Sequence, residues 1–176
     1  MTIDDFHIGE LEGEDLQFFI IAAMKTIFLV VFALVASLSL SAQTEFINPK
    51  GLAAPHGYTH VIATKPGKMV FISGQVAMDK AGHLVGKGDL RTQTKQVFEN
   101  LKAALAAAGA TFDDVVKITW YVKGYNPSLL PTLRDVRDQY VKKEAPPAST
   151  LVGVTSLFQD DYLLEVDAVA VIAQKQ

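Results

Sequence analysis

Two acidic residues stand in a segment that is otherwise apolar. Glu165 lies among leucine, valine and alanine in residues 163–171, a pattern typical of a β-strand. Burying an ionised carboxylate there is costly unless the group is paired or lines a cavity, so Glu165 is a candidate general base. The alternative is an edge-strand or intersubunit ion pair with a lysine. Asp167 lies on the same face two residues later, and there a structural polar contact is favoured.

Two other places could contact a small molecule. Ser73 and Gly74 follow a β-prone run, and a glycine at such a point lets a ligand approach the main chain closely. Taken alone, the pair is a weak signal and would usually be a strand end. Tyr58 precedes a strand-like run. An aromatic side chain at such a position lies either in the core or in a pocket, and the two interpretations are equally favoured.

Three motifs occur in order along the chain: Ile72-Ser73-Gly74-Gln75-Val76, Pro147-Ala148-Ser149-Thr150-Leu151-Val152-Gly153-Val154, and the strand that carries Glu165. Together they resemble the Rid family (YjgF/YER057c/UK114, the "endoribonuclease L-PSP" group) of small imine and enamine deaminases. The resemblance covers about Phe46 to Ala173. It implies a chorismate-mutase-like fold, assembly as a homotrimer around a central barrel, and ligand pockets at the three subunit interfaces.

The resemblance also implies roles for single residues. Glu165 matches the glutamate that positions or activates the water attacking the imine carbon. Ser73 and Gly74 match residues whose hydroxyl and backbone lie against the ligand. Tyr58, within Pro55-His56-Gly57-Tyr58, loosely matches a tyrosine that closes the pocket. No metal and no cofactor are implied.

The chain departs from the family pattern at Ser149. In the catalytic branch this position is an arginine that binds the substrate carboxylate, and a serine cannot imitate its rigid fork of donors. Only the hydroxyls of Ser149 and Thr150 remain there. The chain's three arginines, Arg91, Arg134 and Arg137, fall in helical segments, where surface solvation is expected. The departure argues against ordinary 2-imino acid deamination.

The hydrophobic pattern predicts an α+β fold. The predicted elements are strands at Thr59 to Thr64 and Lys68 to Ser73, a helix from Asp89 to about Ala108, a strand at Val115 to Val122, a helix at Ser128 to Tyr140, and strands at about Ser149 to Ser156 and Tyr162 to Ile172. Lys65-Pro66-Gly67 is a turn signal, which predicts that the first two strands form a hairpin. The order ββαβαββ predicts a sheet with two helices on one face.

The other face of that sheet needs a cover. Val152, Val154, Val169 and Val171 alternate with small residues on the last two strands. Apolar residues on a face that would otherwise meet water indicate oligomerisation.

Composition limits the classes of function. The 176 residues are 49% apolar, enough for one ordinary core and one domain. There is no cysteine, which excludes disulfides, thiolate metal sites and a cysteine nucleophile. From Gln43 onward 15 basic and 13 acidic residues are scattered along the chain, so no nucleic-acid surface is predicted and RNA cleavage is disfavoured.

The N-terminal part has the layout of a secretory signal peptide. Met24-Lys25 is a short basic beginning, and an apolar run extends from Thr26 to Leu40. Small residues follow, which predicts cleavage after Ala42 or, alternatively, after Ser41. The alternative is a membrane anchor formed by Phe18 to Leu40.

Residues 1–23 hold six acids and no lysine or arginine, which suits neither a signal peptide nor a cytoplasmic flank, so translation is expected to begin at Met24. The predicted organisation is an upstream extension over 1–23, a signal peptide over 24–42 and a single domain over 43–176.

Two functions remain open. The favoured one is a periplasmic or secreted metal-free hydrolase of small reactive imines, enamines or related metabolites, with Glu165 orienting water. The alternative is a trimer that binds a small molecule at its subunit interfaces without turnover. Neither involves nucleic acid, and neither leaves a stable membrane anchor after signal cleavage.

Overall fold

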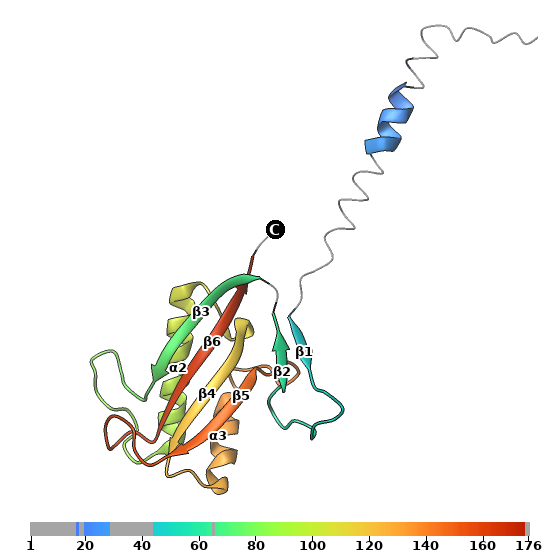
Figure 1. Ribbon diagram of the computed structural model, residues 1–176. Helices are drawn as coiled ribbons and strands as arrows, with labels where there is room; N and C mark the ends of the chain where they lie inside the picture. Colours follow the sequence, from blue (N-terminus) through green and yellow to red (C-terminus); the bar gives the residue numbers. More distant parts are fainter. Residues whose placement is uncertain (1–16, 18–19, 29–43, 65, 175–176) are drawn as a thin grey trace, which may run out of the picture. The chain divides into compact units, whose positions relative to one another are not determined.

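The computed structural model describes residues 17, 20–28, 44–64 and 66–174 (Figure 1). The chain divides between Ser41 and Ala42 into two units. In the first unit residues 20–28 are helical with exposed side chains, and no helix formed by described residues is long and apolar enough to cross a membrane. The predicted signal peptide, the alternative anchor and the extension over 1–23 lie largely outside the described residues.

The second unit is built on a mixed four-stranded sheet. Its strands, in spatial order, are β3 (Gly67–Gln75), β6 (Leu164–Ala173), β4 (Val115–Lys123) and β5 (Ala148–Val154). β6 is antiparallel to both neighbours, whereas β4 and β5 are parallel. A parallel pair needs a crossover connection, and α3 (Leu130–Arg137) supplies it.

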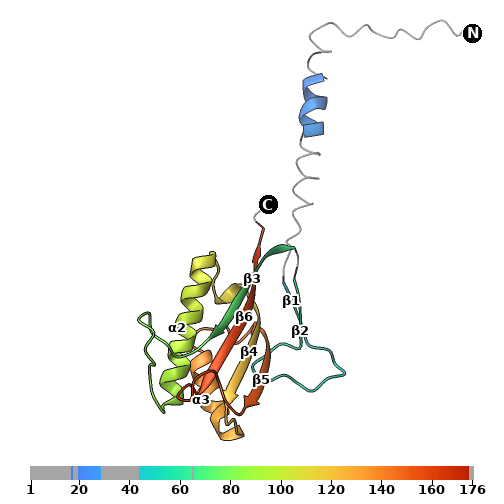
Figure 2. The same cartoon turned by 60° about the vertical axis from the view of Figure 1, so that its left-hand side comes forward.

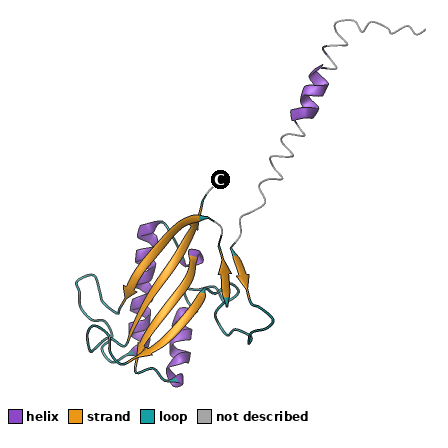
Figure 3. Cartoon of the chain, viewed as in Figure 1, coloured by secondary structure: helices purple, strands orange, loops and turns teal. Residues whose placement is uncertain are grey.

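Both helices cover the same face of this sheet, which Figures 2 and 3 show from two sides. α2 is Leu90–Ala108, and short 3-10 turns, Phe112–Asp114 and Pro127–Leu129, precede β4 and α3. The predicted α+β class, with two helices on one face of the sheet, is therefore confirmed.

The predicted hairpin is wrong. β2 (Val61–Ala63) pairs with β1 (Glu45–Ile47), which the sequence did not reveal, and the two form a separate antiparallel ribbon. β3 pairs instead with β6, about a hundred residues later in the chain. At Pro66-Gly67 the chain therefore passes from the two-stranded ribbon to the four-stranded sheet.

The first predicted helix is confirmed together with its ends. The Asp89 carboxylate accepts hydrogen bonds from the backbone N–H groups of Arg91 and Thr92, at 3.0 and 3.2 Å. The hydrogen bond from the Thr92 hydroxyl is the largest cause that lowers the pKa of Asp89, and the two backbone hydrogen bonds lower it further. Gly109 ends the helix with a φ of 80°, in the left-handed region.

The core lies between the helices and the sheet. Val97, Leu101 and Leu105 of α2 are buried, as their spacing predicted. Strict alternation on the central strands supplies the other half of the core: Ile118, Trp120 and Val122 on β4, and Leu164, Val166, Ala168 and Ala170 on β6. The odd-numbered residues of β6, Glu165 among them, therefore point to the opposite face.

That open face carries exposed apolar side chains. Phe71 is 74% exposed, Met69 57% and Val152 41%. Phe71 and Met69 lie opposite Val169 and Val171 in the register of β3 and β6. A contiguous apolar strip of this kind needs burial against another surface.

Candidate functional site

The Glu165 carboxyl lies directly against the main chain of Gly74. The pairing of β3 with β6 is regular up to Ile72 and resumes at Gln75 after a register shift, which leaves Ser73 and Gly74 in an irregular segment. A Cβ built on Gly74 would lie 1.7 Å from Glu165 Oε1 and 2.6 Å from its Cδ. No side chain fits there while the Glu165 carboxyl keeps this position, so the constraint on Gly74 is one of space rather than of backbone conformation.

The carboxylate of Glu165 is half-buried, and the described residues provide it with neither a hydrogen bond nor an ion pair. Among the residues that the structure describes, no lysine pairs with it. Ser73 is exposed at the same irregular segment, next to Gly74. The structure thus brings together three of the predicted site residues, Glu165, Gly74 and Ser73, on the open face of the sheet.

Asp167 has the structural contact that its position predicted. The Tyr121 hydroxyl donates a hydrogen bond to its Oδ2 at 3.2 Å. The negative charge of Asp167 raises the pKa of Tyr121, and that hydrogen bond, desolvation and the charge of Glu165 raise it further. Tyr121 also lies opposite Glu165 in the register of β4 and β6.

Ser149 and Tyr58 lie elsewhere, in a hollow of about 290 Å³. Ser149 is opposite the buried Ile118 in the β4–β5 register, so its side chain faces the helix layer. Tyr58 is half-buried, and its ring meets that of His60 edge-on with centroids 5.1 Å apart. The hollow is lined by His56, Gly57, Tyr58, Trp120, Tyr125, Leu130, Leu133, Arg134, Arg137, Ser149 and Leu151.

Thr150 does not share this hollow. It follows Ser149 on a strand, so it points to the open face, where the Lys117 ammonium group donates a hydrogen bond to its hydroxyl. Ser149 and Thr150 therefore point to opposite faces of the sheet. Ser149 alone remains on the side of the hollow.

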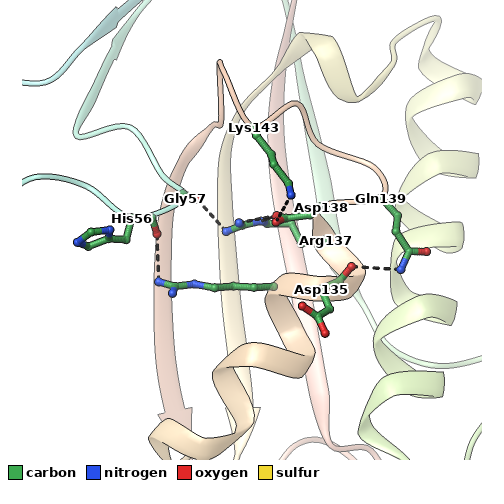
Figure 4. Close-up of polar contacts among 8 residues, drawn as sticks. His56, Gly57, Asp135, Arg137, Asp138, Gln139 and Lys143 are labelled. Atoms are coloured by element: carbon green, nitrogen blue, oxygen red, sulfur yellow. Dashed lines mark hydrogen bonds and ion pairs between the residues drawn. The ribbon is translucent and has the colours of Figure 1, made fainter.

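Two arginines reach that hollow, contrary to the expected surface solvation. Arg137 Nη1 donates to the carbonyl of Gly57 at 2.7 Å, and Arg134 Nη2 donates to the carbonyl of His56 at 3.0 Å. The Arg137 side chain is only 12% exposed and pairs with Asp138 at 2.6 Å (Figure 4). Sequence reasoning missed them, although their i, i+3 spacing on α3 places both on one face of the helix.

Arg91, by contrast, is solvated as expected. Its side chain is 54% exposed, and it pairs with Asp135 at 3.1 Å across the two helices.

The predicted site residues therefore form two groups on opposite faces of the sheet. Ser73, Gly74 and Glu165 lie on the open face at β3 and β6, whereas Tyr58 and Ser149 lie on the helix side near the edge strand β5. Within the described residues the two groups therefore face away from each other.

An α+β sheet with two helices on one face, and a carboxylate set against a glycine main chain on the other, defines a small domain with a candidate ligand site. Residues 49–172 match the family described as Endoribonuclease L-PSP. The chain belongs to this family, the Rid or YjgF/YER057c/UK114 family.

Individual relatives agree with this assignment. A RutC family protein of Pyrococcus horikoshii is 42% identical over 109 residues, 61% of this chain and 82% of the relative. A 2-iminobutanoate/2-iminopropanoate deaminase of Dermatophagoides farinae is 32% identical over 110 residues, 62% of this chain and 83% of the relative. The crystal structure of a Rid-family protein of unknown function from Yersinia pestis is 36% identical, with a TM-score of 0.68 over 73% of this chain and 98% of the other.

Proposed function

We propose that this protein is a deaminase-type hydrolase of small imines, enamines or related metabolites. The observation that carries the proposal is the carboxylate of the half-buried residue Glu165, which has no partner among the described residues and lies against Gly74. A carboxylate without a partner can accept a proton from water, as a general base must. The similarity to a protein named 2-iminobutanoate/2-iminopropanoate deaminase supports the same chemistry.

In the proposed reaction Glu165 orients a water molecule toward the imine carbon. As the water oxygen bonds to that carbon, Glu165 accepts one proton of the water and the imine nitrogen takes up a proton from the solvent. Glu165 then returns its proton to the nitrogen as the carbon–nitrogen bond breaks, and the remaining hydroxyl proton leaves to the solvent as the carbonyl forms. Ammonia and a carbonyl compound leave, so the net reaction consumes one imine and one water.

The direct test is ammonia release from small imines generated in solution. Purified mature protein is expected to accelerate it above the spontaneous rate for at least one member of a panel that includes neutral imines and 2-imino acids. Binding of panel members with no acceleration of any of them would instead support the alternative, a small-molecule binding protein without turnover.

We further propose that the site is completed by assembly into a homotrimer. Because the two groups of site residues face opposite sides of one sheet, Glu165 and Gly74 of one subunit would meet the Ser149 hollow of its neighbour. The exposed Phe71 and Met69 supply apolar area for the contact.

Light scattering on the mature protein is expected to give three times the mass of one chain at micromolar concentration. Phe71→Asp is expected to shift the population toward the monomer, because a carboxylate on the buried strip would be desolvated. A monodisperse monomer of the unaltered protein would contradict both the trimer and the shared pocket.

We also propose export to the periplasm or beyond, on the sequence pattern that begins at Met24. Expressed from Met24 in a Gram-negative host, the protein is expected in the periplasmic fraction with Gln43 as its first residue, or one residue earlier. N-terminal sequencing checks this, and Met24 retained on a membrane-bound product would show the anchor of Phe18 to Leu40 instead.

A further inference from the structure

The hollow beside Ser149 contains one guanidinium without an acidic partner. Of the chain's three arginines, Arg91 pairs with Asp135 and Arg137 with Asp138, whereas no carboxylate pairs with Arg134 among the described residues. Arg134 is half-buried and lines the hollow. A cation held at the wall of a concave site, without a counter-charge, is suited to bind an anion.

The neighbouring charges favour an anion as well. A second hollow of about 320 Å³ adjoins the first and shares Arg134 and Arg137 with it. Its other lining residues include Lys142 and Lys143, and Asp138 is the only acid among them. Asp138 pairs with Arg137 and Lys143, as Figure 4 shows, so Arg134 is left with the local excess of positive charge.

The rest of the hollow sets the kind of anion. Trp120, Leu133 and Leu151 form apolar walls, and the Tyr58 and Ser149 side chains lie on the same lining. The space of about 290 Å³ suits a small organic molecule with an apolar body and one charged group.

The geometry points to Arg134 as the anchor of a carboxylate-bearing ligand in this hollow. Arg134 is anchored by one hydrogen bond, from Nη2 to the carbonyl of His56, which fixes its position and leaves other N–H donors of the fork for a carboxylate. The inference rests on the proposed function in one respect: it takes this hollow as part of the same ligand site. It names the substrate class as small carboxylates, which Ser149 alone could not select.

A matched pair of probes tests this inference. Phenylacetate and phenylacetamide have the same apolar body and differ in charge, and their binding to the mature protein can be followed by ligand-observed NMR or calorimetry. The acid is expected to bind at least about tenfold more tightly than the amide, because hydrogen bonds to a charged group are the stronger ones. Equal affinities, or no binding of either probe, would overturn the inference.

Variants separate a binding role from a structural one. Arg134→Gln is expected to weaken phenylacetate binding roughly 10- to 100-fold and to abolish the preference for the acid. Arg134→Lys keeps the charge and should retain a preference, and Arg91→Gln, the matched control, should bind as the unaltered protein does. A folded Arg134→Gln trimer with undiminished preference for the acid would show that Arg134 only ties the 56–57 loop to α3. If Arg134→Gln does not fold, Arg134→Lys takes its place: a reduced preference for the acid is expected, because an ammonium group cannot reproduce the guanidinium fork, and undiminished phenylacetate affinity with an undiminished preference would count against the anchor.

The same experiment distinguishes failure of the hydrolase from failure of the anchor. Arg134-dependent binding without hydrolysis of any imine would end the hydrolase proposal and leave the carboxylate anchor standing. If the protein hydrolyses carboxylate-bearing and neutral imines, and Arg134→Gln changes neither rate, the carboxylate anchor is wrong and the hydrolase proposal stands.

Discussion

Glu165→Gln should lower the rate of imine hydrolysis by roughly 100- to 10,000-fold, the usual contribution of a positioned general base. Glutamine preserves the size and hydrogen-bonding shape of the side chain but cannot accept the proton of water. Its effect is therefore expected in the rate constant for turnover rather than in ligand affinity. Initial rates of ammonia release, measured beside phenylacetate binding, would show this split.

Asp167→Asn is the matched control for this result. Asp167 lies on the same face of β6, two residues from Glu165, but its carboxylate already accepts the Tyr121 hydroxyl. Its replacement should change the turnover rate much less than Glu165→Gln does. Undiminished turnover in Glu165→Gln, or an equal loss in both variants, would remove Glu165 from its proposed role.

Local signals predicted the parts of the fold that local interactions decide. α2 was predicted with its ends because Asp89 satisfies its first N–H groups and Gly109 can adopt the left-handed conformation, and both effects act within a few residues. The pairing of β3 is different. Its partner β6 is distant in sequence, and a turn signal at Pro66-Gly67 says only that the chain changes direction.

The candidate site shows the same limit. Family motifs marked Gly74 and Glu165 separately, but only the register of β3 on β6 shows that one fills the space beside the other. Arg134 and Arg137 were assigned to solvent because a helix pattern does not reveal which loop will cover one of its faces. The 56–57 loop, about eighty residues earlier, brings its carbonyl groups to both guanidinium groups.

Gly74→Ala should reduce hydrolysis about 100-fold while the domain remains folded. The added Cβ would lie 1.7 Å from Glu165 Oε1, a distance no real contact tolerates, so the carboxylate must move. Because the nearest atoms belong to the end of a flexible side chain, the backbone can stay in place and stability should fall little. A displacement of about 1 Å in a catalytic group can cost on the order of 100-fold in rate.

Gly51→Ala is the control for this substitution, since nothing lies within 4 Å of its added Cβ, and turnover and stability should both be unchanged. The decisive comparison is the double variant. If Gly74→Ala acts by displacing the Glu165 carboxylate, it should add almost nothing to the loss already caused by Glu165→Gln, because both changes remove one interaction. Fully additive losses in turnover, measured on proteins with matched unfolding midpoints, would mean that the main chain at Gly74 acts on the ligand independently of Glu165.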